Sequence, residues 1–155
     1  MTVYLSLGSN LGDREANLKR AIELLQARLG VAPKRVSAIL ETPAWGFEGP
    51  AFLNCAVCFE LDRPWTPTRL LNATQAIELR LGRRGAPEWD AQGRRIYHDR
   101  PIDIDLLFWG TKTVRTTRLT IPHPLIAERD FVLIPLREIA DDAIKEAFPA
   151  IFETK

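Results

Sequence analysis

The spacing of apolar residues predicts two amphipathic helices in the 155-residue chain. The first runs from about Asp13, a suitable N-cap, to Leu29, before Gly30, and the second runs from a threonine at position 66 or 68 to about Leu81. Their apolar faces are formed at helical spacing by Leu18, Ile22, Leu25 and Leu29, and by Leu70, Ala73, Ile77 and Leu81. Each helix therefore has one face to pack against a sheet.

Short β-prone runs complete the pattern. They cover Val3–Leu7, Val36–Glu41, Phe52–Leu61 and Ile102–Phe108, and a turn at Gly110–Thr111 leads to a short hairpin partner, Lys112–Arg115. The order β-α-β-β-α-β is typical of a ferredoxin-like α+β fold, an antiparallel sheet with two helices on one face. A proline-bounded connection and a short helix or strand segment then form a C-terminal extension. No repeat, low-complexity tract or linker divides residues 1–155, so a single domain is expected.

Composition narrows the class of protein. Hydrophobic residues make up 46%, charged residues 26%, and the net charge is +1, so the molecule is not built to coat nucleic acid. No apolar run approaches the roughly 20 residues that cross a bilayer, and the N-terminus lacks the basic region of a signal peptide. A cytoplasmic protein is expected. Cys55 and Cys58 lie three residues apart in a predicted strand, where they face opposite sides and pack in the core.

Two acidic residues interrupt the apolar strand in RPIDIDLLFWG. Asp103 and Asp105 share one face of the strand, roughly 7 Å apart at their Cα atoms, whereas Ile102, Ile104 and Leu106 face the other way into a core. Burying two like charges is costly, and bound magnesium would offset that cost. The alternative is a pair of salt bridges to arginines on an exposed sheet face.

The preceding loop favours a polyphosphate site. Between positions 80 and 100 the chain has three acids and six arginines, Arg80, Arg83, Arg84, Arg94, Arg95 and Arg100. Arginines bind phosphate oxygens bidentately, and the glycines at 82, 85 and 93 would let the loop move as a lid. The alternative is a solvated basic loop.

Aromatic residues indicate a second recognition surface. Trp45, Phe47 and Phe52 surround the irregular TPAWGFEGP segment, and Phe131 lies in the tail. Flat rings beside a polar group such as Asn54 suit a planar heterocycle, although aromatic residues at strand ends more often belong to the core.

Two further features are interpreted as structural. GSNLGD lacks the endings and spacing of known glycine-rich phosphate loops, so a turn and a helix start explain it. His98 and His123 are too far apart in the sequence to form a local metal motif.

The motifs together resemble those of the hydroxymethyl-dihydropterin pyrophosphokinases. They are LGSNLGD, ETPAWG, FLNCAV, QAIELRLGR, RPIDIDLL and LTIPHP-x6-FVLIPL, in this order, and the similarity runs from Val3 to about Ala140. The resemblance implies a ferredoxin-like enzyme of folate biosynthesis. It would transfer the β,γ-diphosphate of ATP to the hydroxymethyl group of the pterin, release AMP and use two magnesium ions.

The resemblance also implies residue roles. The implied magnesium ligands are Asp103 and Asp105, which are catalytic together with Arg83 and Arg100. The implied ATP-binding residues are Glu78, Arg83, Arg100, Leu106, Arg118, Thr120, His123 and Arg129. The implied pterin-binding residues are Thr42, Pro43, Trp45, Phe52, Asn54 and Phe131, with the two phenylalanines stacked on either side of the ring.

One stretch departs from the family pattern, because many relatives have Trp-Gly-Pro-Arg where this chain has Tyr97-His98-Asp99-Arg100. Tyr97 is expected to take the place of the tryptophan. A monomer that binds ATP and the pterin, without nucleic acid or membrane, is expected. The rival hypotheses are an RNA- or ligand-binding ferredoxin-like module, disfavoured because an RNP-type aromatic strand motif is missing, and another D-x-D transferase that would release UDP or ADP.

Overall fold

A computed structural model describes residues 1–44, 49–82, 88–89, 91–93, 95–96 and 100–153. The strands are β1 (Thr2–Ser9), β2 (Arg35–Val36), β3 (Leu40–Thr42), β4 (Phe52–Glu60), β5 (Glu88–Trp89), β6 (Arg95–Ile96), β7 (Asp103–Trp109), β8 (Val114–Arg115) and β9 (Thr120–Ile121). The helices are α1 (Arg14–Leu29), α2 (Pro67–Arg80), the 3₁₀ turn η1 (Ile126–Glu128), α3 (Asp130–Ile139), α4 (Asp142–Ala147) and α5 (Pro149–Phe152). Within this part of the chain no helix is long and apolar enough to cross a membrane.

The main sheet is antiparallel and has the strand order β2-β4-β1-β7, with β3 also paired to β4. β7 therefore lies at one edge, beside the N-terminal strand β1. This is the ferredoxin-like arrangement that the element order predicts, and the prediction is confirmed.

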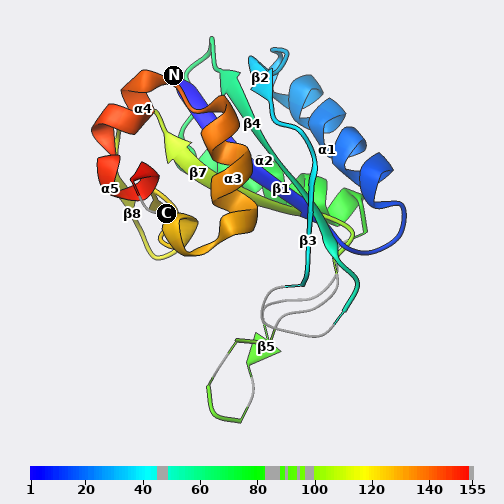
Figure 1. Cartoon of the computed structure of the whole chain (residues 1–155). Helices are drawn as coiled ribbons and strands as arrows, with labels where there is room; N and C mark the ends of the chain where they lie inside the picture. The colour runs from blue at the N-terminus through cyan, green and yellow to red at the C-terminus, as the bar shows by residue number, and fades with distance from the viewer. Residues whose placement is uncertain (45–48, 83–87, 90, 94, 97–99, 154–155) are drawn as a thin grey trace.

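Each face of the sheet has its own hydrophobic core. One core packs α1 and α2 against residues such as Leu5, Val57 and Ile104. The other packs α3 and α4 against Tyr4 and Phe108. Figure 1 shows α1 on one side of the sheet and α3 on the other. The C-terminal extension thus covers the face that the first two helices leave open.

The two cysteines are divided between these cores, as predicted. Cys55 belongs to the core under α1 and α2, Cys58 belongs to the core under α3, and both are buried and free. Burial raises the pKa of the Cys55 thiol to about 12. A buried thiol with a high pKa is a packing residue and not a nucleophile.

Local capping fixes both long helices. The Asp13 carboxylate accepts a hydrogen bond from Ala16 N–H at 3.1 Å, and α1 ends at Gly30, whose φ of 76° is left-handed. Thr66 accepts from Arg69 N–H at 3.2 Å. The N-cap of α2 is therefore Thr66, and position 68 is excluded.

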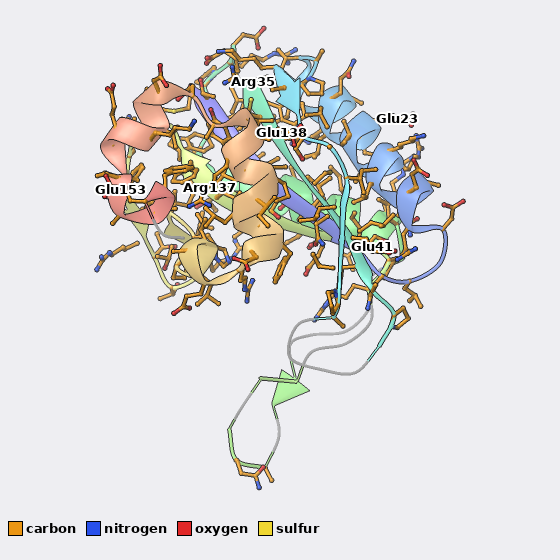
Figure 2. The ribbon with its side chains drawn as sticks, in the orientation of Figure 1. Glu23, Arg35, Glu41, Arg137, Glu138 and Glu153 are labelled. Atoms are coloured by element: carbon orange, nitrogen blue, oxygen red, sulfur yellow. The ribbon has the colours of Figure 1, made fainter. Side chains whose placement is uncertain are left out.

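The strand predicted over Val36–Glu41 is two short strands. Between them, Ala38 N–H donates to both carboxylate oxygens of Glu138 on α3, at 3.1 Å each, so this amide is not part of the β-ladder. Figure 2 labels Glu138 on α3 beside the β2–β3 segment. A contact from the C-terminal extension therefore breaks the strand, which the local sequence could not indicate.

Three other predictions were wrong in detail. The segment predicted as a hairpin partner of the acidic strand makes one bridge, Trp109 to Lys112, and its strand Val114–Arg115 pairs with Thr120–Ile121. Two residue pairs of the region expected to be irregular form the small β5–β6 hairpin. The C-terminal extension, predicted to hold one short helix or strand segment, forms α3, α4 and α5.

Candidate active site

A row of three residues crosses the sheet at the end where β1 finishes. Gly8 lies opposite Asn54 of β4 on one side and opposite Asp103 of β7 on the other. Directly opposite residues of antiparallel strands project to the same face, so the Asn54 and Asp103 side chains flank Gly8, with their Cα atoms about 10 Å apart. One row further along, Ser6 lies between Ala56 and Asp105. Both aspartates thus share a face with Asn54.

The alternation predicted for the acidic strand is confirmed. Asp103 and Asp105 are half-buried, whereas Ile104 and Leu106 are each 4% exposed and lie in the core under α1 and α2. The Leu106 side chain is therefore on the opposite face from the aspartates, and only its backbone remains for the ATP contact that the resemblance implies.

A polar and aromatic group gathers around Asn54. The Asn54 amide donates to Thr42 Oγ1 at 2.8 Å and to the Leu40 carbonyl at 3.3 Å. A Cβ at Gly8 would lie 3.1 Å from Asn54 Oδ1 and 3.4 Å from the Phe52 ring, so both side chains approach the bare backbone of β1. The structure therefore brings Thr42, Phe52 and Asn54 together, and Pro43 follows Thr42 as an exposed residue.

A second group forms around His123. Its Nδ1 accepts a hydrogen bond from Leu125 N–H at 3.2 Å, so the neutral ring carries its proton on Nε2. Burial and, to a smaller extent, the positive charge of Arg129 lower the pKa of His123 to about 4, and the negative charge of Asp103 opposes them. His123 therefore lies close enough to Arg129 and Asp103 to be affected by both charges.

The N-terminal end of α3 contributes a cation and a ring. The Arg129 guanidinium lies 5.7 Å from the centre of the Phe131 ring, within the range of a cation–π contact. Phe131 is half-buried in the first turn of α3. Both residues lie where α3 approaches the sheet face that carries the aspartates.

Two buried charged residues flank the acidic strand. Glu78 of α2 is 6% exposed, and its carboxylate accepts a hydrogen bond from Ile104 N–H at 2.8 Å, between the two aspartates. Arg100 is 9% exposed, and its backbone bonds to Asn10. Through this hydrogen bond Glu78 supports the strand, whereas the resemblance implies contact with ATP.

Arg118 and Thr120 lie on the β8–β9 hairpin and are both exposed. The Arg118 guanidinium donates to Asn72 Oδ1 at 2.9 Å and to Gln75 Oε1 at 3.1 Å, both on α2. This ties the hairpin to α2.

Several predicted residues lie outside the described part of the chain. They are Trp45 and Arg83 from the proposed site, and Phe47, Arg84, Arg94, Tyr97, His98 and Asp99 from the two loops. Their roles, and the lid, stay predictions.

The sequence analysis missed several residues that hold the site together. They are Gly8, Asn10, Arg14, Asn72 and Gln75. The GSN of the first turn was the available signal, but it was interpreted only as a turn. The role of this turn depends on contacts with segments that are distant in the sequence.

The donor set fits magnesium. Asp103 and Asp105 supply two hard carboxylate groups on one face of a rigid strand. Magnesium is usually held by one or two carboxylates and completes its shell with phosphate oxygens and waters.

Comparison with known proteins identifies the family. Residues 4–141 match the family model of 7,8-dihydro-6-hydroxymethylpterin-pyrophosphokinase. The chain belongs to this family. The resemblance predicted from the motifs is therefore confirmed, and the protein is a pyrophosphokinase of folate biosynthesis that uses ATP.

Curated relatives agree over nearly the whole chain. The 2-amino-4-hydroxy-6-hydroxymethyldihydropteridine pyrophosphokinase of Porphyromonas gingivalis is 45% identical over 140 residues, which cover 89% of this chain and 90% of that protein. The Bacillus subtilis protein of the same name is 41% identical over 148 residues, covering 95% and 83%. A crystal structure of an HPPK-DHPS in complex with substrates matches with a TM-score of 0.65 and 14% identity, over 96% of this chain and 43% of that one. At this identity the structural match supports the fold alone.

Proposed function

We propose that the family's reaction takes place on the face that carries Asn54, Gly8 and Asp103. In this reaction the diphosphate of ATP is transferred to the hydroxymethyl group of 6-hydroxymethyl-7,8-dihydropterin, and AMP is released. The observation that carries the proposal is the strand register, which sets Asn54 and Asp103 on either side of Gly8. The pterin, bound at Asn54, and the phosphates of ATP, bound near Asp103, can then meet above Gly8, which has no side chain.

The pterin half of the site contains Phe52, Asn54 and Thr42 from the sheet and Phe131 from α3. The two rings stack on the heterocycle, and the Asn54 amide and the Thr42 backbone bind its polar edge. Pro43 and Trp45 lie beside them. The hydrogen bond from Asn54 to Thr42 orients the amide before substrate arrives.

The ATP half contains the two aspartates and the surrounding cationic residues. Asp103 and Asp105 would hold two magnesium ions, which would supply positive charge to neutralise the phosphate oxygens. Arg83, Arg100, Arg118 and Arg129 bind the phosphates. The Thr120 hydroxyl binds the phosphates beside these arginines. The Leu106 backbone and Glu78 bind the rest of the nucleotide.

The neutral His123 ring donates a hydrogen bond to a phosphate oxygen. Its Nδ1 already accepts from Leu125 N–H, so Nε2–H is the available donor. Because its pKa is lowered to about 4, the ring is neutral at physiological pH. Catalysis then rests on alignment of the hydroxymethyl oxygen with the phosphorus and on preorganised charge, which are the main contributions in phosphoryl transfer.

The remaining expectations belong to the same proposal. The chain acts as a monomeric, cytoplasmic, single-domain enzyme on two small molecules, without nucleic acid or membrane. Gel filtration with light scattering, with and without substrates, tests the monomer, and a dimer would contradict it.

Product analysis tests the reaction. The protein is mixed with ATP, magnesium and hydroxymethyl-dihydropterin, and phosphorus NMR follows the nucleotides, with a control that lacks the pterin. Pterin-dependent AMP that appears in step with a pterin diphosphate is expected. ADP with a pterin monophosphate would overturn diphosphate transfer, and UDP or ADP from another acceptor would favour a different D-x-D transferase.

A further inference from the structure

The turn after β1 reaches both halves of the proposed site. Asn10 is 1% exposed, and its side-chain oxygen accepts a hydrogen bond from Arg100 N–H at 2.6 Å, while its side-chain nitrogen donates to the Pro50 carbonyl at 3.1 Å. The Asn10 backbone N–H also donates to the Arg100 carbonyl at 3.0 Å. One side chain therefore joins two segments that are distant in the sequence.

These two segments lead directly to the two sets of substrate residues. Arg100 precedes β7, which begins at Asp103, and Pro50 precedes β4, which begins at Phe52. Asn10 therefore joins the entry to the phosphate-binding strand to the entry to the pterin-binding strand. Asparagine suits this place because its amide offers an acceptor and a donor at once.

A second contact reinforces the pterin side. Arg14, in the first turn of α1, donates to the Ala51 carbonyl at 2.8 Å and to the Glu41 carboxylate at 2.9 Å. The carbonyls of Pro50 and Ala51 are thus both held from the segment Asn10–Arg14. Figure 2 labels Glu41 on β3, near the end of the sheet where this contact is made.

We infer that Asn10 is a positioning residue that couples the pterin half of the site to the ATP half. The inference rests on the proposed function, because it uses the substrate halves assigned there. It acts through the backbones of Arg100 and Pro50, to which its side chain is hydrogen bonded. The GSNLGD turn is therefore part of the substrate machinery, although it does not bind phosphate as a glycine-rich loop does.

Because the side chain is shared, the two substrates should bind cooperatively. ATP that immobilises Arg100 also fixes Asn10, which leaves Pro50 and Phe52 preorganised for the pterin. Binding coupling is reciprocal, so each substrate raises the affinity for the other by the same factor. Loss of either hydrogen bond should reduce this factor toward 1.

Two substitutions separate the two contacts. Asn10→Asp keeps an acceptor for Arg100 N–H but loses the donor and sets a carboxylate against the Pro50 carbonyl. Asn10→Ala removes both contacts. A lost buried partner typically weakens the dependent interaction by roughly 10- to 100-fold. We expect Asn10→Asp to weaken pterin binding by that factor while ATP binding changes less than about 3-fold, and Asn10→Ala to weaken both.

Isothermal titration calorimetry measures these affinities. The pterin is titrated into the protein with and without magnesium and a nonhydrolysable ATP analogue, the analogue is titrated alone, and kcat and both KM values are measured in parallel. Asn17→Ala is the matched control, because the Asn17 side chain, on α1, donates to Ser9 Oγ and to the Leu11 carbonyl and so supports the same turn without bonding to Arg100 or Pro50. It should keep the wild-type coupling factor.

Arg14→Met provides a variant that leaves Asn10 in place, in case the Asn10 variants do not fold. It should raise the KM for the pterin and leave the KM for ATP unchanged. The inference fails if folded Asn10 variants keep the wild-type coupling factor, or if Arg14→Met changes neither KM. The proposed function fails separately if the wild-type protein forms no pterin diphosphate.

Discussion

At the scale of single residues, the two aspartates of β7 are the proposed metal ligands. Asp103 and Asp105 lie on one face of a strand whose other face is buried in the core. Like charges in a half-buried position repel each other, and a bound cation relieves that repulsion. Their removal should therefore affect the reaction more than the fold.

Asp103→Asn and Asp105→Asn are each expected to lower kcat/KM by at least about 100-fold, because a metal ligand supplies several kcal/mol of charge stabilisation. The free energy of unfolding should fall by less than about 1 kcal/mol. Urea unfolding and the AMP-release assay measure the two quantities. Asp62→Asn, an exposed carboxylate in the loop after β4, should retain wild-type activity. Normal turnover in both site variants would remove the magnesium assignment.

His123 gives a prediction about pH. The pKa of His123 in the folded state lies near 4, below the ordinary 6.5. Between pH 4 and pH 6.5 the unfolded chain therefore binds a proton that the native state does not bind. The stability contribution is complete above pH 6.5 and is lost as pH falls toward 4, by at most about 2 kcal/mol at pH 5. Urea unfolding at pH 7 and pH 5 should show a smaller loss for His123→Gln than for wild type.

Proton NMR of the metal-free protein tests the same prediction directly. The chain has two histidines, so the spectrum of His123→Gln assigns the resonances. The His123 ring signals should stay in the neutral position down to about pH 5. A midpoint near 6.5 would show that the ring is not desolvated and would remove this pH dependence.

At the scale of elements, α2 supports the edge of the sheet. β7 is an edge strand, and Ile104 N–H donates to Glu78 instead of to another strand. The Glu78 carboxylate therefore holds β7 at Ile104. This residue lies between Asp103 and Asp105, the proposed metal ligands. This places Glu78 as a support for the strand through a contact that its sequence motif did not reveal.

Glu78→Ala should destabilise the protein by about 1–3 kcal/mol, because it leaves a buried N–H without its acceptor. It should also weaken binding of magnesium and ATP. Glu78→Gln retains an acceptor and should recover most of both losses, as measured by urea unfolding and calorimetry. Leu79→Ala, at the next position of α2 and 60% exposed in the wild type, is the control and should change neither. Equal losses in the Gln and Ala variants would show that the charge matters more than the hydrogen bond.

The same elements show what the sequence could and could not predict. The stripe ending at Leu29 and the caps Asp13 and Thr66 are local signals, and they placed α1 and α2 correctly. The break between β2 and β3 depends on Glu138, which is 100 residues away from Ala38. Tertiary contacts of this kind leave no trace in the spacing of nearby residues.

The candidate site also has features that the sequence could predict and features that it could not. The alternation around Asp103 was visible because a strand has period two, and the structure agrees with it. The place of Gly8 between Asn54 and Asp103 depends on the register of three strands, which a single sequence does not specify. The family motifs supplied the residue types, and the register supplied their proximity.

At the scale of the whole molecule, the sheet has a different role on each face. One face is covered by α1 and α2, which pack on it to form a hydrophobic core. The other is covered by α3 and α4 around Tyr4 and Phe108, while the row Asn54–Gly8–Asp103 extends the same face beyond them. Substrate binding should therefore stabilise the entire domain, since the contacts proposed for the substrates come from β3, β4, β7 and α3 together.

Magnesium and ATP at 100 times their dissociation constant should stabilise the folded state by about 2.7 kcal/mol. For a domain of this size that corresponds to a rise in Tm of roughly 5–10 °C. Differential scanning fluorimetry should show the shift with magnesium and lose most of it with EDTA or in the Asp103→Asn Asp105→Asn double variant. Phe131→Ala should keep the ATP shift and lose the additional shift caused by the pterin, because its ring belongs to the other half of the site. Equal shifts of Tm in the double variant and in wild type would show that ATP binds elsewhere. The aspartates of the strand would then interact with another partner.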